Sequence, residues 1–205
     1  MANTLRELLI QRAARLQERP ALTAPNWNTL SYAKLRNRVE GVAMGLLATT
    51  PPSAVYSATG TPWDWIAELA AAASGVLWDP AGQSLPRELL GGLRFNDEAG
   101  RGPYHAREQG VQAATPFVPG LEQGELLTRL RRLNVRLGWD HTSEIELPLP
   151  RLGEPATRAA LWSLLYAGGH GLLRPDPQWD PRPFADLWLA PASTSADSPL
   201  PLDNN

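Results

Sequence analysis

The chain has 205 residues, of which 43% are hydrophobic and 20% charged, and its formal net charge is −2. This composition is typical of a soluble globular protein and argues against a nucleic-acid-binding surface. The absence of cysteine excludes disulfides, thiol nucleophiles and thiolate metal sites. No apolar run approaches the roughly 20 residues that span a bilayer, and the N-terminus lacks the basic and apolar segments of a secretory signal. We therefore expect a cytoplasmic protein with no membrane or nucleic-acid partner.

The N-terminal segment predicts an amphipathic helix over residues 5–17. Leucine and alanine recur there on one face, and Thr4 precedes the helix as a candidate N-cap. Glu7 follows three residues later, which is the spacing of a capping box. Pro20 then ends the helix.

Two short strands and a longer helix are expected next. Residues 21–24 and 30–32 have the apolar character of short strands, and a polar turn separates them. Ser31 is a candidate cap for a helix over residues 32–48, which Pro51 ends.

The following segment predicts a strand–helix–strand crossover, the unit from which parallel sheets are built. Residues 54–58 form the first apolar run, Pro62 suits the first turn of a helix, and Gly75 closes that helix. Residues 76–79 are the second apolar run.

Residues 80–120 predict an irregular loop region, because proline and glycine are frequent there. Residues 87–90 are a candidate helical turn and residues 93–96 a candidate short strand. Residues 98–110 show little periodicity.

Residues 121–137 predict an amphipathic helix with leucines on its inner face. Its four arginines suggest either a phosphate-binding surface or a solvated helix face: Arg129, Arg131, Arg132 and Arg136. The solvated face is favoured, because the chain is slightly acidic and no aromatic residues lie between the arginines.

A second crossover is expected over residues 145–175, where an apolar run, a helix from Pro155, a glycine stop and another apolar run follow in order. Residues 184–190 predict one more short helix or strand, and residues 191–205 a disordered tail. We thus predict one α/β domain over residues 1–190, with a mostly parallel sheet and helices on both faces.

Several segments together resemble the N-terminal part of the AMP-forming adenylating synthetases, a family that includes acyl-CoA synthetases and the adenylation domains of peptide synthetases. No single motif is specific, but the weak matches occur in the family's order. They cover about residues 1–80 and 121–186 and lie at residues 19–22, 30–39, 43–46, 65–80, 137–150, 161–174 and 180–184.

The departures from the family concern its chemistry. The resemblance implies a Ser/Thr/Gly-rich loop that ends in a lysine and cradles ATP phosphates. Residues 113–120 stand there instead, with two prolines and no lysine, and Pro150-Arg151 replaces the family's histidine or aromatic residue. Lys34, the one lysine, lies on an N-terminal helix. The family's later acidic motif, ribose-binding aspartate and C-terminal catalytic lysine have no counterpart. We therefore expect no catalytic residue and no cofactor.

Other polar groups offer weaker alternatives. A zinc site built from His105, His141 and His170 with Asp140 or Glu144 lacks metal-ligand spacing, so we predict no metal site.

Two turns and two carboxylate pairs also need a structural interpretation. Residues 57–61 are a candidate anion-binding turn. Residues 167–171 follow a helix C-terminus, which favours turn glycines over an anion site. The carboxylate pairs are expected to face solvent: Asp64 with Glu68, and Glu144 with Glu146.

Tryptophan is frequent, with eight residues in the chain. Seven of them suggest either an apolar ligand cleft or core and interface packing, and packing is favoured: Trp63, Trp65, Trp78, Trp139, Trp162, Trp179 and Trp188.

Our leading functional hypothesis is a non-catalytic relic of the synthetase family that acts through binding or assembly. A truncated chain would expose an apolar face, so we expect a homo-oligomer or a protein partner that covers it. The alternative is a retained acyl or nucleotide ligand site with weak adenylate chemistry, or half of a split enzyme.

Overall fold

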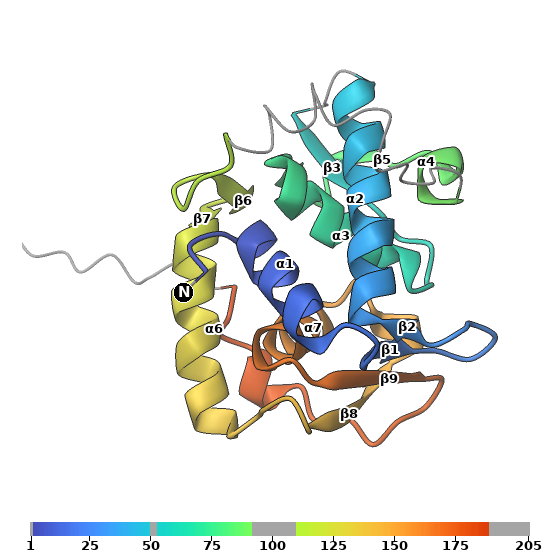
Figure 1. Cartoon of the computed structure of the whole chain (residues 1–205), viewed down its shortest axis with the longest axis vertical. Coiled ribbons are helices and arrows are strands. Elements are labelled where there is room, and N and C mark those ends of the chain that lie inside the picture. Colours follow the sequence, from blue (N-terminus) through green and yellow to red (C-terminus); the bar gives the residue numbers. More distant parts are fainter. Residues whose placement is uncertain (1, 50–52, 92–109, 189–205) are drawn as a thin grey trace, which may run out of the picture.

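A computed structural model describes residues 2–49, 53–91 and 110–188 of the chain. Helices and strands alternate along it (Figure 1). The elements are α1 (Leu5–Leu16), β1 (Pro20–Thr23), β2 (Leu30–Ser31), α2 (Tyr32–Ala48), β3 (Ala54–Tyr56), α3 (Trp63–Ser74), β4 (Leu77–Trp78), β5 (Gln83–Ser84), α4 (Arg87–Gly91), β6 (Pro116–Val118), β7 (Leu121–Glu122), α6 (Gln123–Leu137), β8 (Glu144–Pro148), the 3-10 turn η1 (Leu149–Arg151), α7 (Pro155–Ala167), β9 (His170–Arg174) and the 3-10 turn η2 (Arg182–Phe184).

Both predicted crossovers are confirmed. Strands β8 and β9 pair in parallel from Glu144 opposite His170 to Pro148 opposite Arg174, and α7 connects them. Strands β3 and β4 also pair in parallel, and α3 connects them. The α/β class with parallel strands is therefore confirmed.

The parallel pairs are divided over two sheets. A four-stranded sheet has the order β2-β1-β9-β8, in which only β1 and β2 are antiparallel. A three-stranded parallel sheet has the order β4-β3-β5. Helices α1, α3 and α7 lie between the two sheets (Figure 1).

Local capping explains where the helices begin. The Thr4 side chain accepts a hydrogen bond from the Glu7 amide at 3.1 Å, and the Glu7 carboxylate accepts one from the Asn3 amide at 2.7 Å. Ser31 accepts from the Lys34 amide at 3.3 Å in the same way. The predicted caps of α1 and α2 are thus confirmed.

The regions around α6 and η2 differ from prediction. Helix α6 begins at Gln123 and not at residue 121, because Leu121 pairs with β6 in a hairpin that the sequence did not predict. Near the C-terminus the structure has the 3-10 turn η2, followed by a turn up to Trp188. The candidate strand over residues 93–96, nearly all of the irregular segment over residues 98–110 and the tail over residues 191–205 lie outside the described residues.

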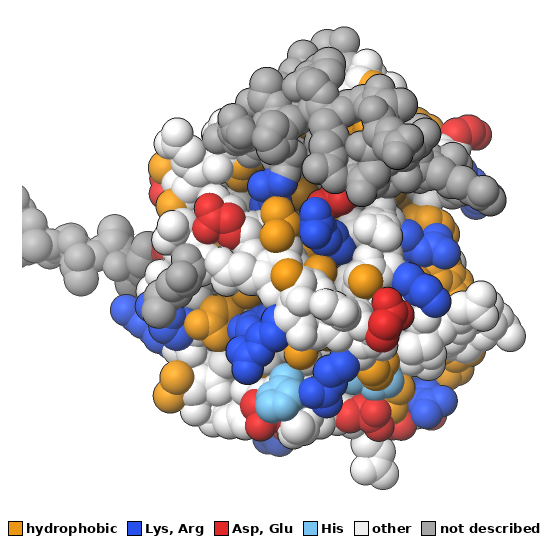
Figure 2. Space-filling view, viewed as in Figure 1, with side chains coloured by type: hydrophobic (Ala, Val, Ile, Leu, Met, Phe, Trp, Pro, Cys, Tyr) orange, Lys and Arg blue, Asp and Glu red, His pale blue; other side chains and the backbone are white. Residues whose placement is uncertain are grey.

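Within the described residues, no helix is both long and apolar enough to cross a membrane. The exposed surface mixes charge types: Figure 2 shows acidic, basic and apolar side chains interspersed on one face. In the part of the chain that the structure describes, Val135 is the one large hydrophobic residue classed as exposed, at 81%.

Candidate functional site

The segment in place of the family's phosphate loop forms the β6–β7 hairpin and its connection to α6. The amide of Thr115 donates to the Gln112 carbonyl, and the amides of Gln123 and Gly124 donate to the carbonyls of Thr115 and Ala113, at 2.8–3.0 Å. Donors that a phosphate would need at the start of α6 are therefore already hydrogen-bonded within the protein.

Gln123 fixes this hairpin to the core. Its side chain is fully buried, accepts a hydrogen bond from the Leu5 amide at 3.0 Å and donates one to the Ala72 carbonyl at 2.8 Å. One amide group thus joins the first turn of α6 to α1 and α3. This region therefore connects α6 to α1 and α3 through buried contacts.

The turn over residues 57–61 binds an internal carboxylate. Asp64 accepts hydrogen bonds from the Ser57 hydroxyl, the Thr59 amide and hydroxyl, and the Gly60 amide, at 2.7–2.9 Å. These donors make the concave arrangement that binds anions, and Asp64 fills it. The turn therefore has the geometry of an anion site whose ligand is part of the chain.

The prediction that Asp64 and Glu68 face solvent is wrong. Asp64 is 4% exposed and Glu68 is 1% exposed. Glu68 lies on α3 and accepts two hydrogen bonds from Arg158 of α7, at 2.8 and 2.7 Å. Trp162 adds a third from its ring N–H at 2.8 Å. A buried carboxylate is stable only with such partners, and here they come from a helix distant in sequence.

The second carboxylate pair lies at the surface, as predicted. Glu144 contacts His170 at 2.9 Å, and Glu146 contacts Arg174 at 3.4 Å across the parallel β8–β9 pair. Both carboxylates are about half exposed. Glu146 and Arg174 form a cross-strand ion pair, and Glu144 and His170 form a cross-strand hydrogen bond.

The histidines do not come together. Both ring nitrogens of His170 are hydrogen-bonded at 2.9 Å, one to Glu144 and the other to the Thr23 hydroxyl. His141 lies with Asp140 on a separate turn, and His105 lies outside the described residues. The described part of the chain contains no group of three or more potential metal ligands from His, Cys, Asp and Glu.

The glycines after α7 form a helix stop. Gly168 adopts a positive φ of 89°, and the Tyr32 hydroxyl donates to the Gly169 carbonyl at 2.6 Å. The Arg12 guanidinium donates to the carbonyls of Leu165 and Tyr166. A cation at this position complements the negative end of the helix, as expected for a helix C-terminus.

The tryptophans pack against one another and against the core. Trp162 is fully buried and contacts Phe117 edge-on at 5.3 Å between ring centroids. Phe184 stacks on Trp179 and also contacts Trp139. Trp65 and Trp78 are also buried, Trp63 contacts Trp27, and Trp188 contacts Phe117. These contacts agree with the packing role.

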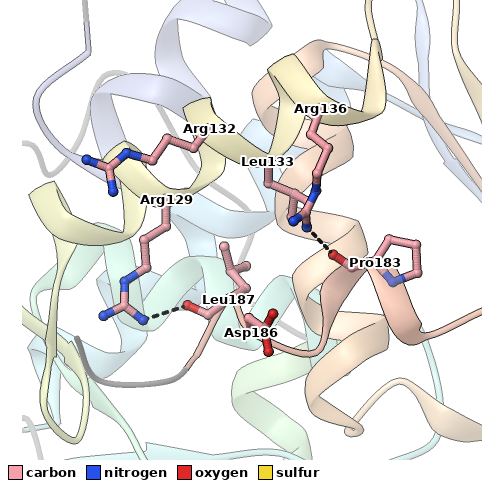
Figure 3. A pocket seen from close by; sticks show the side chains of 7 residues that line it. All are labelled: Arg129, Arg132, Leu133, Arg136, Pro183, Asp186 and Leu187. Atoms are coloured by element: carbon pink, nitrogen blue, oxygen red, sulfur yellow. Dashed lines mark hydrogen bonds between the residues drawn. The ribbon is translucent and has the colours of Figure 1, made fainter. Parts of the chain in front are cut away.

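The surface of the described chain includes two hollows beside arginine side chains. The first, termed the arginine hollow, measures about 230 Å³ and lies between α6 and residues 183–187, which include part of η2 (Figure 3). It is lined by Arg129, Arg132, Leu133, Arg136, Pro183, Asp186 and Leu187. The second measures about 260 Å³ and lies at the C-terminal ends of α1, α6 and α7; it is lined by Arg12, Arg15, Leu16, Asn134, Trp139, Asp140, His141, Tyr166 and Ala167.

The arginines of α6 are only partly a solvated face. Arg129 is 15% exposed, donates to the Leu187 carbonyl at 3.0 Å and pairs with Glu125. Arg136 donates to the Pro183 carbonyl at 2.8 Å. The helical spacing placed these arginines on α6, but only the folded chain brings residues 183–187 to them.

No protein-family model matches the sequence, and no curated protein is significantly similar to it. The fold matches solved structures. MatB from Rhodopseudomonas palustris has a TM-score of 0.63 and 16% identity over 91% of this chain and 47% of its own. A protein of the same species assigned as a long-chain-fatty-acid CoA ligase has a TM-score of 0.60 and 18% identity over 85% and 58%.

The N-terminal subdomain of NpsA from Klebsiella oxytoca, in complex with 3-hydroxyanthranilyl-AMSN, has a TM-score of 0.59 and 13% identity over 86% of this chain and 55% of its own. The chain thus spans about half the length of the solved chains that it matches. It has the fold of the N-terminal subdomain of adenylating enzymes, the group of acyl-CoA ligases and peptide-synthetase adenylation proteins.

Proposed function

We propose that this chain is a non-catalytic member of the adenylating-enzyme fold group and acts through assembly, with a second copy or with another protein. The observation that carries the proposal is the β6–β7 hairpin. Adenylation needs donors that neutralise and align the phosphates of ATP. Here the corresponding amides of Thr115, Gln123 and Gly124 bond to the chain itself, and no lysine lies in the segment.

Strand β8 is the surface that supports assembly. It pairs with β9 on one side and is the edge of the four-stranded sheet within the described residues. An edge strand presents unpaired amide and carbonyl groups, which another strand can extend. Because Val135 is the one large exposed hydrophobic residue of the described chain, the sheet edge supports assembly better than an apolar face.

Sedimentation equilibrium at micromolar concentration tests assembly. We expect a mass of about twice the 22.4 kDa of one chain, or a stable complex when the partner is present. Hydrogen exchange adds the location: those amides of residues 144–147 that do not bond to β9 should become less protected on dilution. A monodisperse monomer whose β8 exchange is independent of concentration, with no complex formed in the presence of a candidate partner, contradicts the proposal.

A second candidate is a retained acyl or nucleotide site, completed by another chain in a split enzyme. The coverage of about half of each matched chain favours it. ATP–pyrophosphate exchange with a panel of carboxylic acids separates the two functions. The non-catalytic proposal requires no exchange and no thermal shift with ATP, AMP or acyl-CoA. Exchange by this chain alone would overturn it.

A further inference from the structure

We propose that the arginine hollow is a binding site for hydrogen phosphate. Three arginines of α6 line it from successive turns of the helix: Arg129, Arg132 and Arg136. Leu133 and Leu187, both nearly buried, are the apolar part of its lining. A volume of about 230 Å³ is several times the roughly 30 Å³ that one water occupies, so the hollow admits a tetrahedral oxyanion.

Two of the three guanidiniums are held in place before any ligand binds. Arg129 bonds to the Leu187 carbonyl and Arg136 to the Pro183 carbonyl (Figure 3). Each arginine uses only some of its five N–H donors in these bonds. Side chains that are already ordered lose less conformational entropy when a ligand binds.

The third guanidinium, that of Arg132, remains available to a ligand. Within the described residues, Arg132 has no hydrogen-bond or ion-pair partner, and Asp186 forms no ion pair although it lines the same hollow. The lining thus contains three arginines and one carboxylate, while Glu125 offsets part of the Arg129 charge. The hollow is locally basic in a chain whose net charge is −2.

The presence of three arginines in the lining favours phosphate over a carboxylate ligand. A planar carboxylate matches one guanidinium fork, whereas the tetrahedral oxygens of phosphate can accept from several guanidiniums at once. Asp186 adds selectivity for a protonated anion. Inorganic phosphate carries a proton at neutral pH and can donate it to the Asp186 carboxylate, whereas sulfate has no proton to donate and is repelled.

The test is titration of the ¹⁵N-labelled full chain with inorganic phosphate or sulfate at pH 7 and constant ionic strength, followed by NMR. We expect saturable shifts with phosphate in the millimolar range and much weaker binding of sulfate. Arg132→Gln should weaken phosphate binding about tenfold, the loss of one charge-assisted hydrogen bond. Arg131→Gln removes the same charge from the same helix outside the hollow and should weaken binding less than about twofold.

Asp186→Asn should raise sulfate affinity to that of phosphate, because the carboxylate no longer repels a fully ionised anion. Unchanged backbone spectra outside α6 and residues 183–187 establish that each variant folds. Any of three results overturns the proposal: no saturable shift up to about 50 mM phosphate, equal weakening by Arg131→Gln and Arg132→Gln, or sulfate binding to the unmodified chain as tightly as phosphate.

Discussion

Arg158 and Glu68 form a two-pronged ion pair at 2.8 and 2.7 Å that joins α7 to α3. The pair is almost closed from water, with side-chain exposures of 9% and 2%. The Arg158 guanidinium also lies 4.6 Å from the ring centroid of Trp188. The helices of the two crossovers are therefore linked by a charge pair that is surrounded by aromatic side chains.

Replacing Glu68 by Gln should lower the free energy of unfolding by about 3–5 kcal/mol, because Arg158 would remain as a buried charge without its counter-ion. Denaturant unfolding measures this. Glu146→Gln is the matched control: it removes an ion pair with Arg174 whose side chains are about half exposed, so it should cost less than about 1 kcal/mol. Equal losses of unfolding free energy in the two variants would show that the buried Glu68–Arg158 pair stabilises the fold no more than the exposed Glu146–Arg174 pair.

Replacing Asp64 by Asn should lower the free energy of unfolding by about 2–3 kcal/mol. Asp64 accepts four hydrogen bonds in the turn over residues 57–61, and an amide nitrogen in place of one oxygen would face a donor. Thermal and denaturant unfolding measure the change. Asp79→Asn serves for comparison, because the Asp79 side chain accepts one hydrogen bond, from the Ala81 amide. A smaller cost for Asp64→Asn than for Asp79→Asn would contradict this account.

Stability should fall at alkaline pH through Tyr32. Burial is the main cause that raises the pKa of Tyr32 well above its ordinary value, and it outweighs the opposing charges of Arg12 and Arg19. A folded-state pKa above the unfolded value of about 10 favours the neutral hydroxyl. The resulting stability is complete below pH 10 and is lost as pH rises toward the folded pKa.

Urea unfolding from pH 8 to pH 11.5 tests this effect. Tyr32→Phe removes the hydrogen bond to the Gly169 carbonyl and should lower the free energy of unfolding by about 1 kcal/mol at neutral pH. Above pH 10, the free energy of unfolding of this variant should fall less steeply with pH than that of the unmodified chain. Parallel profiles for the two proteins above pH 10 would rule out Tyr32 as the source.

Replacing Asn134 by Leu should stabilise the protein by about 1 kcal/mol. Asn134 is 7% exposed, and within the described residues its side-chain oxygen has no hydrogen-bond partner. Leucine removes this unsatisfied oxygen with the same number of side-chain heavy atoms and has the higher helix propensity. Asn37→Leu, at an exposed position of α2, should stabilise the protein only by the difference in helix propensity between leucine and asparagine. A loss of stability for Asn134→Leu would show that its hydrogen bond to the Leu130 carbonyl matters more.

Local patterns predicted most of the helices and both crossovers, because their causes lie within a few residues. Thr4 and Ser31 cap helices through amides three residues ahead, and Gly168 ends α7 with its own backbone conformation. The β6–β7 hairpin was missed because its strands are short and one begins with proline. Sequence alone also suggested one sheet, since periodicity does not say which crossovers share a sheet.

The candidate sites were harder to predict, because distant segments build them. Glu68 and Arg158 are 90 residues apart, so a surface helix was a reasonable expectation for Glu68 until α7 covered it. The arginine hollow likewise needs Pro183 and Leu187 beside α6. Spacing along one helix shows which side chains share a face but not what lies opposite that face.

The pairing of β1 with β9 has a consequence for synthesis of the protein. Thr23 and His170, which hydrogen-bond across these strands, are 147 residues apart, and β1 lies in the middle of its sheet. At translation rates of about 5–20 residues per second, β1 waits roughly 7–30 s for its parallel neighbour. During that interval its apolar side chains and one row of backbone donors have no sheet partner. The nascent N-terminal half should therefore depend on the ribosome or on chaperones until β9 emerges.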